Sequence, residues 1–312
     1  MTHELFPSNI KYCILTDAAA DLDDNYLNAH PEVRVIPMSV VLEEQEYTYG
    51  PGGNLSQKQF YELLNEKSNV STSQINIEAY LNYFEQILAS GMDILYLCFS
   101  SGLSGMYQNA VFAAEEMMQT FPERKILCVD TLCAAPGEGA LVREAVQQMR
   151  RGLDLESLAE WSESKKHAVS HWFTVDNLMY LHKGGRVSAS TAVLGTALQI
   201  KPLLNVDSKG MLQVVGKSRG TKRAMSDLIH KMSDYWMPEW SKSVAVVHAD
   251  SQEQANQLQK MVEQQFPEAS VYQAEIGPVI GSHTGSGLLA LVFWGGGRDM
   301  TDKIKKAGDI DV

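Results

Sequence analysis

Cysteine is scarce in this sequence, which excludes a scaffold held together by disulfides. Only four cysteines occur in 312 residues, and no two form a CxxC pair. Cys13, Cys98 and Cys128 each lie inside a short apolar run, as buried strand thiols in a reducing compartment do, and Cys133 follows such a run. Without a paired thiol or a neighbouring base, all four are interpreted as inert packing residues, and we expect a cytoplasmic protein.

The chain also lacks an excess of positive charge and a long hydrophobic run. Its 26 Lys and Arg stand against 38 Asp and Glu, a net charge of −12 that opposes binding to nucleic-acid phosphates. The apolar run at residues 288–294 is far shorter than the ~20 residues that cross a bilayer. Residues 1–10 have neither a basic start nor an apolar core. We therefore expect no nucleic-acid partner, no membrane segment and no export signal.

What is present is the composition of a folded protein large enough for two domains. Apolar residues make up 45% of the chain and charged residues 21%, which excludes disorder as the main state. At roughly 150 residues per domain, the length predicts two domains.

The first half of the chain alternates between strand-like and helical patterns. Three apolar runs, at residues 12–16, 94–99 and 126–129, each end at a small or polar residue. Helical patterns occupy residues 57–66, 77–89, 106–119 and 139–151. This alternation predicts an α/β domain with a mainly parallel sheet. Ligands bind beyond the carboxyl ends of the strands in such sheets, which is where Asp17, Ser100, Ser101 and Asp130 would lie.

The second half starts a new set of strands after a polar helix at residues 152–166. Strand-like runs follow at 168–175, 211–215 and 243–249, and helical patterns at 222–235 and 252–266. We predict an N-terminal α/β domain at 1–165 and a C-terminal α/β domain at 166–312, with a divergent tail after about residue 294. The strand order of the second sheet stays open.

Three motifs resemble known ligand sites but fail on spacing or context. Between Gly210 and Gly216 stand five mostly apolar residues, whereas a phosphate loop needs four flexible ones, so we expect a strand followed by a basic turn. His167 and His171 have helical zinc-site spacing but lack the glutamate of HExxH and run into a strand. Asp17 and Asp21 could be a pair of metal-binding carboxylates, but a loop capped by Asp21 ahead of a short helix is favoured. No metal is expected.

Four polar clusters, each at a loop or the end of an element, are more informative. They lie at residues 70–74, 100–105, 183–186 and 281–287 and combine hydroxyl groups or a cation with glycine. Any one of them is more often a helix cap than a site. Together they offer hydroxyl donors, backbone amides, a histidine and an arginine, which suits binding one small anion such as a carboxylate or phosphate.

An ordered set of nine motifs, spanning residues 14 to 293, resembles the DegV family. The motifs are ILTDAAADL (14–22), VRVIPMSV (33–40), STSQ (71–74), SSGLSGMYQNA (100–110), VDTLCAAPGEG (129–139), LMYLHKGGRVS (178–188), IKPLLNVDSKG (200–210), GKSRG (216–220) and SHTGSG (282–287). The resemblance implies a two-domain α/β protein that holds a long-chain fatty acid between its domains, without a cofactor. It further implies a separate ATP-binding fatty acid kinase subunit, which phosphorylates the bound lipid to acyl phosphate for phospholipid synthesis.

The resemblance also implies roles for particular residues. The carboxylate contacts fall on Thr72 and Ser73, on Ser100 or Ser101, and on His283. The arginine of the family's GGR motif is Arg186, which we assign to the phosphate or product side.

The sequence departs from the family pattern in several places. Ala18 follows Asp17 where the family has Ser or Thr, Ile75 replaces the proline of TSQP, and Met106 replaces the threonine of SGTY. We expect a non-enzymatic lipid-binding protein. Two alternatives stay open: a serine hydrolase using Ser100 or Ser101 with His283, which lacks a GxSxG elbow and a clear orienting acid, and a module that binds a phosphorylated metabolite.

Overall fold

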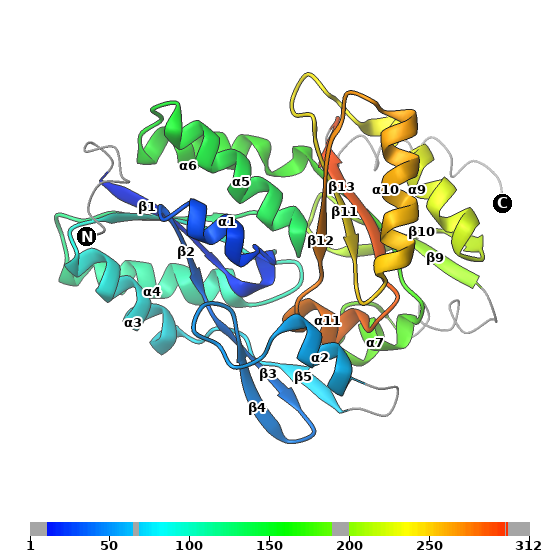
Figure 1. The fold of residues 1–312 in the computed structure, drawn as a ribbon. Helices are drawn as coiled ribbons and strands as arrows, with labels where there is room; N and C mark the ends of the chain where they lie inside the picture. Colours follow the sequence, from blue (N-terminus) through cyan, green and yellow to red (C-terminus); the bar gives the residue numbers. More distant parts are fainter. Residues whose placement is uncertain (1–10, 65–68, 189–199, 297, 299–312) are drawn as a thin grey trace.

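Three sheets build the part of the molecule that the structure describes, and they meet around a common interior (Figure 1). The computed structural model describes residues 11–64, 69–188, 200–296 and 298. The tail expected after about residue 294 therefore lies largely outside the described residues. The α/β class predicted from the sequence is confirmed.

The first sheet is parallel throughout, as predicted, with the strand order β2-β1-β6-β7. Its strands are β1 (Tyr12–Asp17), β2 (Val33–Ile36), β6 (Asp93–Cys98) and β7 (Ile126–Asp130). The helices that accompany it are α1 (Asp24–Ala29), α3 (Ile77–Ala89), α4 (Met106–Thr120), α5 (Pro136–Arg150) and α6 (Leu155–Lys165). Helix α5 begins three residues before the predicted start because Pro136, whose backbone is preset for a helix, occupies its first turn.

The second sheet is mixed, with the order β10-β9-β8-β13-β11-β12. Its strands are β8 (Val169–Thr174), β9 (Ile200–Val206), β10 (Leu212–Arg219), β11 (Ser243–His248), β12 (Ser270–Glu275) and β13 (Leu289–Trp294). Only β11 and β12 pair in parallel. Helices α9 (Thr221–Tyr235) and α10 (Gln252–Gln265) pack their apolar residues on one face of this sheet, which leaves the other face toward the first sheet (Figure 1).

A third, small antiparallel sheet has the order β4-β3-β5 and was not predicted from the sequence. It consists of β3 (Met38–Leu42), β4 (Gln45–Tyr49) and β5 (Val70–Thr72), and it lies below the other two sheets in Figure 1. Nearby elements are α2 (Gln57–Leu63), α7 (Leu178–Lys183) and α11 (Pro278–Thr284), and two 3-10 turns follow β1 (Ala18–Ala20) and α6 (Lys166–Ala168). Strand β5 brings Thr72 against α11, far from it in sequence.

The motifs that failed on spacing have structural roles in the fold. Residues 212–219 form strand β10, with a bulge between Val214 and Gly216, so the expected strand is confirmed. The basic run begins inside this strand and continues into α9, so that only Gly220 separates the two elements. His171 lies in β8 and His167 in the 3-10 turn before it, so the pair does not share a helix face.

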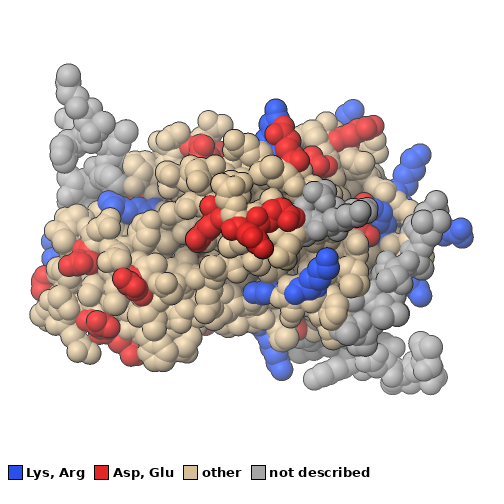
Figure 2. All heavy atoms as spheres, turned by 90° about the horizontal axis from the view of Figure 1, so that it is seen from below, with Lys and Arg blue, Asp and Glu red and all other residues tan. Residues whose placement is uncertain are grey.

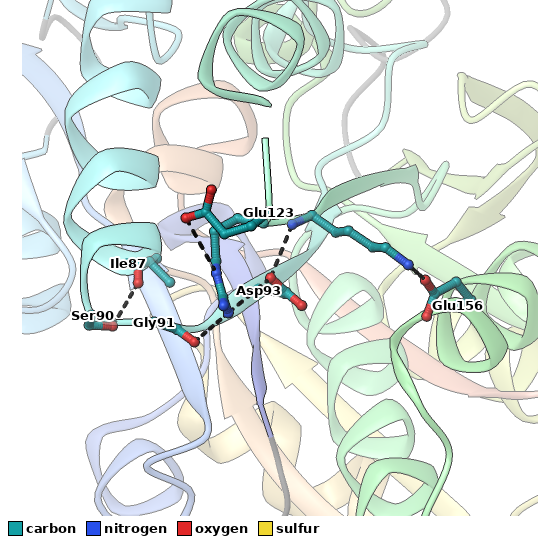
Figure 3. A network of polar contacts seen from close by, with 8 residues as sticks. Ile87, Ser90, Gly91, Asp93, Glu123 and Glu156 are labelled. Carbon is teal, nitrogen blue, oxygen red and sulfur yellow. Dashed lines mark hydrogen bonds and ion pairs between the residues drawn. The ribbon is translucent and has the colours of Figure 1, made fainter. Parts of the chain in front are cut away.

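Polar contacts fix both ends of the first sheet. At its carboxyl edge, the buried carboxylate of Asp17 accepts hydrogen bonds from the Tyr96 hydroxyl (3.0 Å) and from the amides of Ala19 (3.1 Å) and Phe99 (3.3 Å). At the amino edge, Asp93 and neighbouring side chains form the network shown in Figure 3. Within the described residues, no helix is both long and apolar enough to cross a membrane.

Candidate functional site

A cavity of about 410 Å³ lies where the three sheets meet. Ala19 and Phe99, which follow β1 and β6, line it at the carboxyl edge of the first sheet, as expected for an α/β protein. Met38 and Thr72 line it from the small sheet. The six-stranded sheet and several loops and helix ends contribute further parts of the wall.

Most of the cavity wall is apolar. Strand β13 contributes Ala290 and Val292, and β8 contributes Phe173. Because alternate side chains of a strand share one face, Ala290 and Val292, two positions apart, both line the cavity. Such a surface favours a hydrocarbon chain, whose burial releases water from apolar area.

Polar side chains gather where β5, α7 and α11 meet. The Thr72 hydroxyl oxygen lies 2.8 Å from Nε2 of His283, a contact that joins the small sheet to α11. Arg186, just after α7, donates from Nε to the Leu103 carbonyl (3.1 Å) and from Nη1 to the Gly184 carbonyl. Thr72, Arg186 and His283 all line the cavity. The structure therefore brings together three residues that the sequence placed in separate motifs.

His283 is held in its neutral form. Burial, and secondarily the charge of nearby Arg186, lower the pKa of His283 to about 4. Its Nδ1 is buried without a hydrogen-bond partner among the described residues and faces Gly184, where an added Cβ would come within 2.3 Å of it. Because Nδ1 has no acceptor for a proton in the described part of the chain, whereas Nε2 has the Thr72 oxygen, we assign the proton to Nε2, which then donates to Thr72.

Ser100 and Ser101, two of the expected carboxylate contacts, make hydrogen bonds outside the cavity. Ser100 is fully buried and its hydroxyl donates to the Gly210 carbonyl (2.8 Å), while the Ser101 amide donates to Asp130 (3.1 Å). Neither lines the cavity, whereas Ser73, from the STSQ motif, does. The geometry thus places Ser100 and Ser101 in the loop that supports the site.

Sequence reasoning missed Ser104 and Gln74, which both line the cavity. Ser104 lies just before α4, and its hydroxyl accepts from the Met106 amide (3.4 Å). Gly105 is the N-cap of α4 and provides no side-chain cap, so amides of the first turn are left for another acceptor. The sequence carried one signal for this position, the start of the helical pattern at residue 106, because the N-terminus of a helix attracts anions.

The loop between β7 and α5 forms another part of the wall, at Ala134, Ala135 and Pro136. Leu132 and Ala135 adopt φ values of 51° and 55°, which are strained for residues with a Cβ and cost about 1–3 kcal/mol each. His171 packs beside this loop: its Nε2 accepts from the Ala134 amide at 3.5 Å. Burial, with the nearby Arg298 charge, holds the pKa of His171 well below its usual range.

Buried carboxyl groups lie behind the cavity rather than in its wall. Burial raises the pKa of Asp17 to about 6 and the pKa of Asp21 and Glu138 well above their usual values. Glu138 accepts a hydrogen bond from Thr16 (2.8 Å), and Asp21 one from Tyr49 (3.4 Å). Across the described part of the chain, no three or more His, Cys, Asp or Glu side chains group in a way that could hold a metal ion.

The fold and this cavity define an α/β protein with a largely apolar pocket that has a polar end. Comparison with known sequences identifies the family: the profile of the DegV family, described as uncharacterised, matches residues 11–295, and the chain belongs to this family. A DegV domain-containing protein from Clostridium perfringens is 35% identical over 285 residues, which cover 91% of this chain and 98% of the relative.

Solved structures of the family share the fold. A DegV family protein from Thermus thermophilus, whose description reports fatty acid binding, has a TM-score of 0.80 at 26% identity and covers 92% of this chain and 100% of that one. DegV from Bacillus subtilis, described as a fatty acid binding protein, has a TM-score of 0.78 at 27% identity, with 92% of this chain and 99% of that one covered.

Proposed function

We propose that this protein binds one long-chain fatty acid, with the carboxylate at the Thr72 end of the cavity and the chain along the apolar wall. The observation that carries the proposal is the single cavity wall that joins an apolar surface to the cluster of Thr72, Arg186 and His283. Family members from Thermus thermophilus and Bacillus subtilis with the same fold are described as binding fatty acids.

The polar cluster suits a carboxylate in a dry site. When His283 donates from Nε2 to Thr72, the Thr72 hydroxyl hydrogen is free to donate to the ligand. Gly105 provides no side-chain cap at the start of α4, so the dipole of this helix adds partial positive charge at the polar end of the cavity. These groups replace the water shell that the anion loses on entry.

The apolar wall supplies the larger part of the affinity. Burying a chain of about 15 methylenes at roughly 0.8 kcal/mol each gives about 12 kcal/mol of gross driving force, from which the costs of ordering and association are subtracted. Tight binding therefore requires no covalent bond. Ser73 and Gln74 complete the polar lining beside Thr72.

We further propose that the protein presents its lipid to a separate ATP-dependent fatty acid kinase in the cytoplasm, as the non-catalytic subunit. Arg186 then acts on the phosphate side, because its side chain is partly exposed and reaches the Leu103 carbonyl. On the face shown in Figure 2, most Lys and Arg side chains gather on the side of the six-stranded sheet. Strand β10 is part of this sheet and α9 packs on it, and their basic residues offer a docking surface for the kinase. These residues are Lys217, Arg219, Lys222 and Arg223.

The rival functions have less support. A hydrolase would pair Ser100 or Ser101 with His283, but the Ser100 hydroxyl is bonded to Gly210 and His283 is bonded to Thr72. The Nδ1 of His283 has no orienting acid among the described residues. A phosphorylated metabolite is polar and would leave most of the apolar cavity wall without a hydrophobic contact.

Native mass spectrometry of the purified protein tests the proposed function. We expect a retained mass equal to one fatty acid, identified by organic extraction, and uptake of palmitic acid by delipidated protein. A retained phosphate compound would support the metabolite alternative instead. Protein that carries no lipid and takes up no palmitic or stearic acid would refute the proposal.

A further inference from the structure

Arg298 is a buried residue near the end of the described chain, only 3% exposed. Its Nη2 donates to the Cys133 sulfur (2.9 Å), and its Nη1 donates to the Leu132 carbonyl. Both acceptors lie in the loop between β7 and α5. A residue from the far end of the sequence thus binds a loop of the first sheet.

The same guanidinium also binds the second half of the molecule. Its Nε donates to the Val169 carbonyl in β8 (3.0 Å), and other nitrogens reach the carbonyls of Lys166 (3.3 Å) and Asp207 (3.4 Å). Asp207 belongs to the turn between β9 and β10. A planar group with five N–H donors can make this many directed contacts at once, which an ammonium cannot.

The backbone after β13 positions Arg298 for this role. The Gly295 amide donates to the Ala168 carbonyl (2.8 Å), and Gly296 donates to the Tyr235 carbonyl (3.1 Å). A Cβ on Gly295 would lie 2.5 Å from the Tyr235 carbonyl oxygen, so this close approach requires glycine.

The loop that Arg298 binds is strained and forms part of the cavity wall. Leu132 and Ala135 both have positive φ, and Ala135 and Pro136 line the cavity. Strained backbone persists only where its surroundings hold it. The contacts of Arg298 to Leu132 and Cys133 join this loop to β8 and to the turn at Asp207.

We propose that Arg298 is a positioning residue that holds the loop at residues 131–136 as a wall of the cavity and thereby sets the affinity for the ligand. The proposal rests on the proposed fatty-acid function for the identity of that ligand. Arg298 does not line the cavity and acts through the loop. By linkage, a ligand that packs against Ala135 and Pro136 stabilises the observed conformation of this loop, and that conformation raises the affinity for the ligand by the same free energy.

Labelling of thiols with N-ethylmaleimide provides the test, because Cys133 is fully buried beneath the Arg298 side chain. In delipidated Arg298→Met protein, we expect Cys133 to be labelled about tenfold faster than in the parent, while Cys13 and Cys98 in the sheet stay protected. The Kd for palmitic acid should rise about tenfold, and palmitic acid should slow labelling of Cys133 in the parent protein.

Two further variants complete the experiment. Arg298→Lys, which keeps the charge but not the fork of donors, should give intermediate labelling, and it decides the outcome if Arg298→Met does not fold. Arg124→Met is the matched control: Arg124 also donates to a backbone carbonyl, Gly91, but in the network at the amino edge of the first sheet (Figure 3). It should label like the parent.

Two results would overturn the proposal. In one, the Arg298 variants keep Cys133 protected and bind palmitic acid with parental Kd. In the other, Cys13, Cys98 and Cys133 become labelled together, which indicates a general structural role. Failure of the fatty-acid function gives a different result, since a parent that binds no lipid can still show selective labelling of Cys133 in the Arg298 variants.

Discussion

The imidazole of His283 and the hydroxyl of Thr72 lie 2.8 Å apart, although 211 positions separate them in the chain. The contact links α11 to the small antiparallel sheet at the polar end of the cavity. In the proposed site, neutral His283 and its hydrogen-bond partner Thr72 would act as one donor system toward the carboxylate. Removing either one should affect the ligand through the other.

Thr72→Val should weaken fatty-acid binding while leaving the fold intact. The substitution keeps the shape of the side chain and removes its hydroxyl, and one hydrogen bond to a charged partner contributes about 1.5–3 kcal/mol. We expect the Kd for palmitic acid to rise about tenfold or more in a calorimetric titration. Ser71→Ala, an exposed neighbour on the same strand, is the control. Parental affinity in Thr72→Val would remove Thr72 from the site.

His283 should make the protein less stable as the medium becomes acidic. The pKa of His283 is about 4 in the folded protein, against a usual value of 6.5. As the pH falls from 6.5 toward 4, the unfolded chain binds a proton that the folded protein does not, and stability falls by up to about 3 kcal/mol.

The matched variant for this pH effect is His283→Gln, whose amide can still donate to Thr72. Urea unfolding at about pH 7 and about pH 5 should show a smaller loss of stability in the variant than in the parent. Asp17 acts in the opposite direction, because its pKa is raised to about 6, but it is present in both proteins and cancels in the comparison. Equal losses would show that His283 is not buried in its neutral form.

Arg186→Ala should separate lipid binding from phosphorylation. Because Thr72 and the apolar wall remain, uptake of palmitic acid should stay largely intact, whereas acyl phosphate formation by a partner kinase with ATP should fall. Lys183→Ala removes the same charge from an exposed position on α7 and should have little effect on either. Lost uptake with normal turnover of the remaining lipid would instead place Arg186 at the carboxylate.

Asp17→Ala should destabilise the fold strongly. The substitution leaves the Tyr96 hydroxyl and the amides of Ala19 and Phe99 without their buried acceptor, which should cost about 3 kcal/mol or more in chemical denaturation. Asp23→Ala, at the exposed N-cap of α1, should cost only about 1 kcal/mol. A loss of similar size in both variants would contradict the role of Asp17 as the buried acceptor at the sheet edge.

The sequence by itself determined three strands of the parallel sheet and most helices of the first half, because strands buried on both faces and amphipathic helices leave local patterns. The fourth strand, β2, has only four residues and was not predicted. Helix α3 begins and ends at the predicted residues 77 and 89. The small sheet was not foreseen, because its strands are short and partly exposed, and β5 has only three residues. Its pairing depends on long-range contacts that no local pattern records.

The residue types of the candidate site were also readable from the sequence, since hydroxyls, a histidine and an arginine stand beside glycines in polar clusters. Their assembly was decided by the tertiary structure alone. Folding brings Thr72 to His283 and turns the Ser100 hydroxyl toward the Gly210 carbonyl, away from the cavity. It also brings Arg298 back to Cys133. The direction of a side chain and its partner depend on how distant segments pack, and local sequence does not encode that packing.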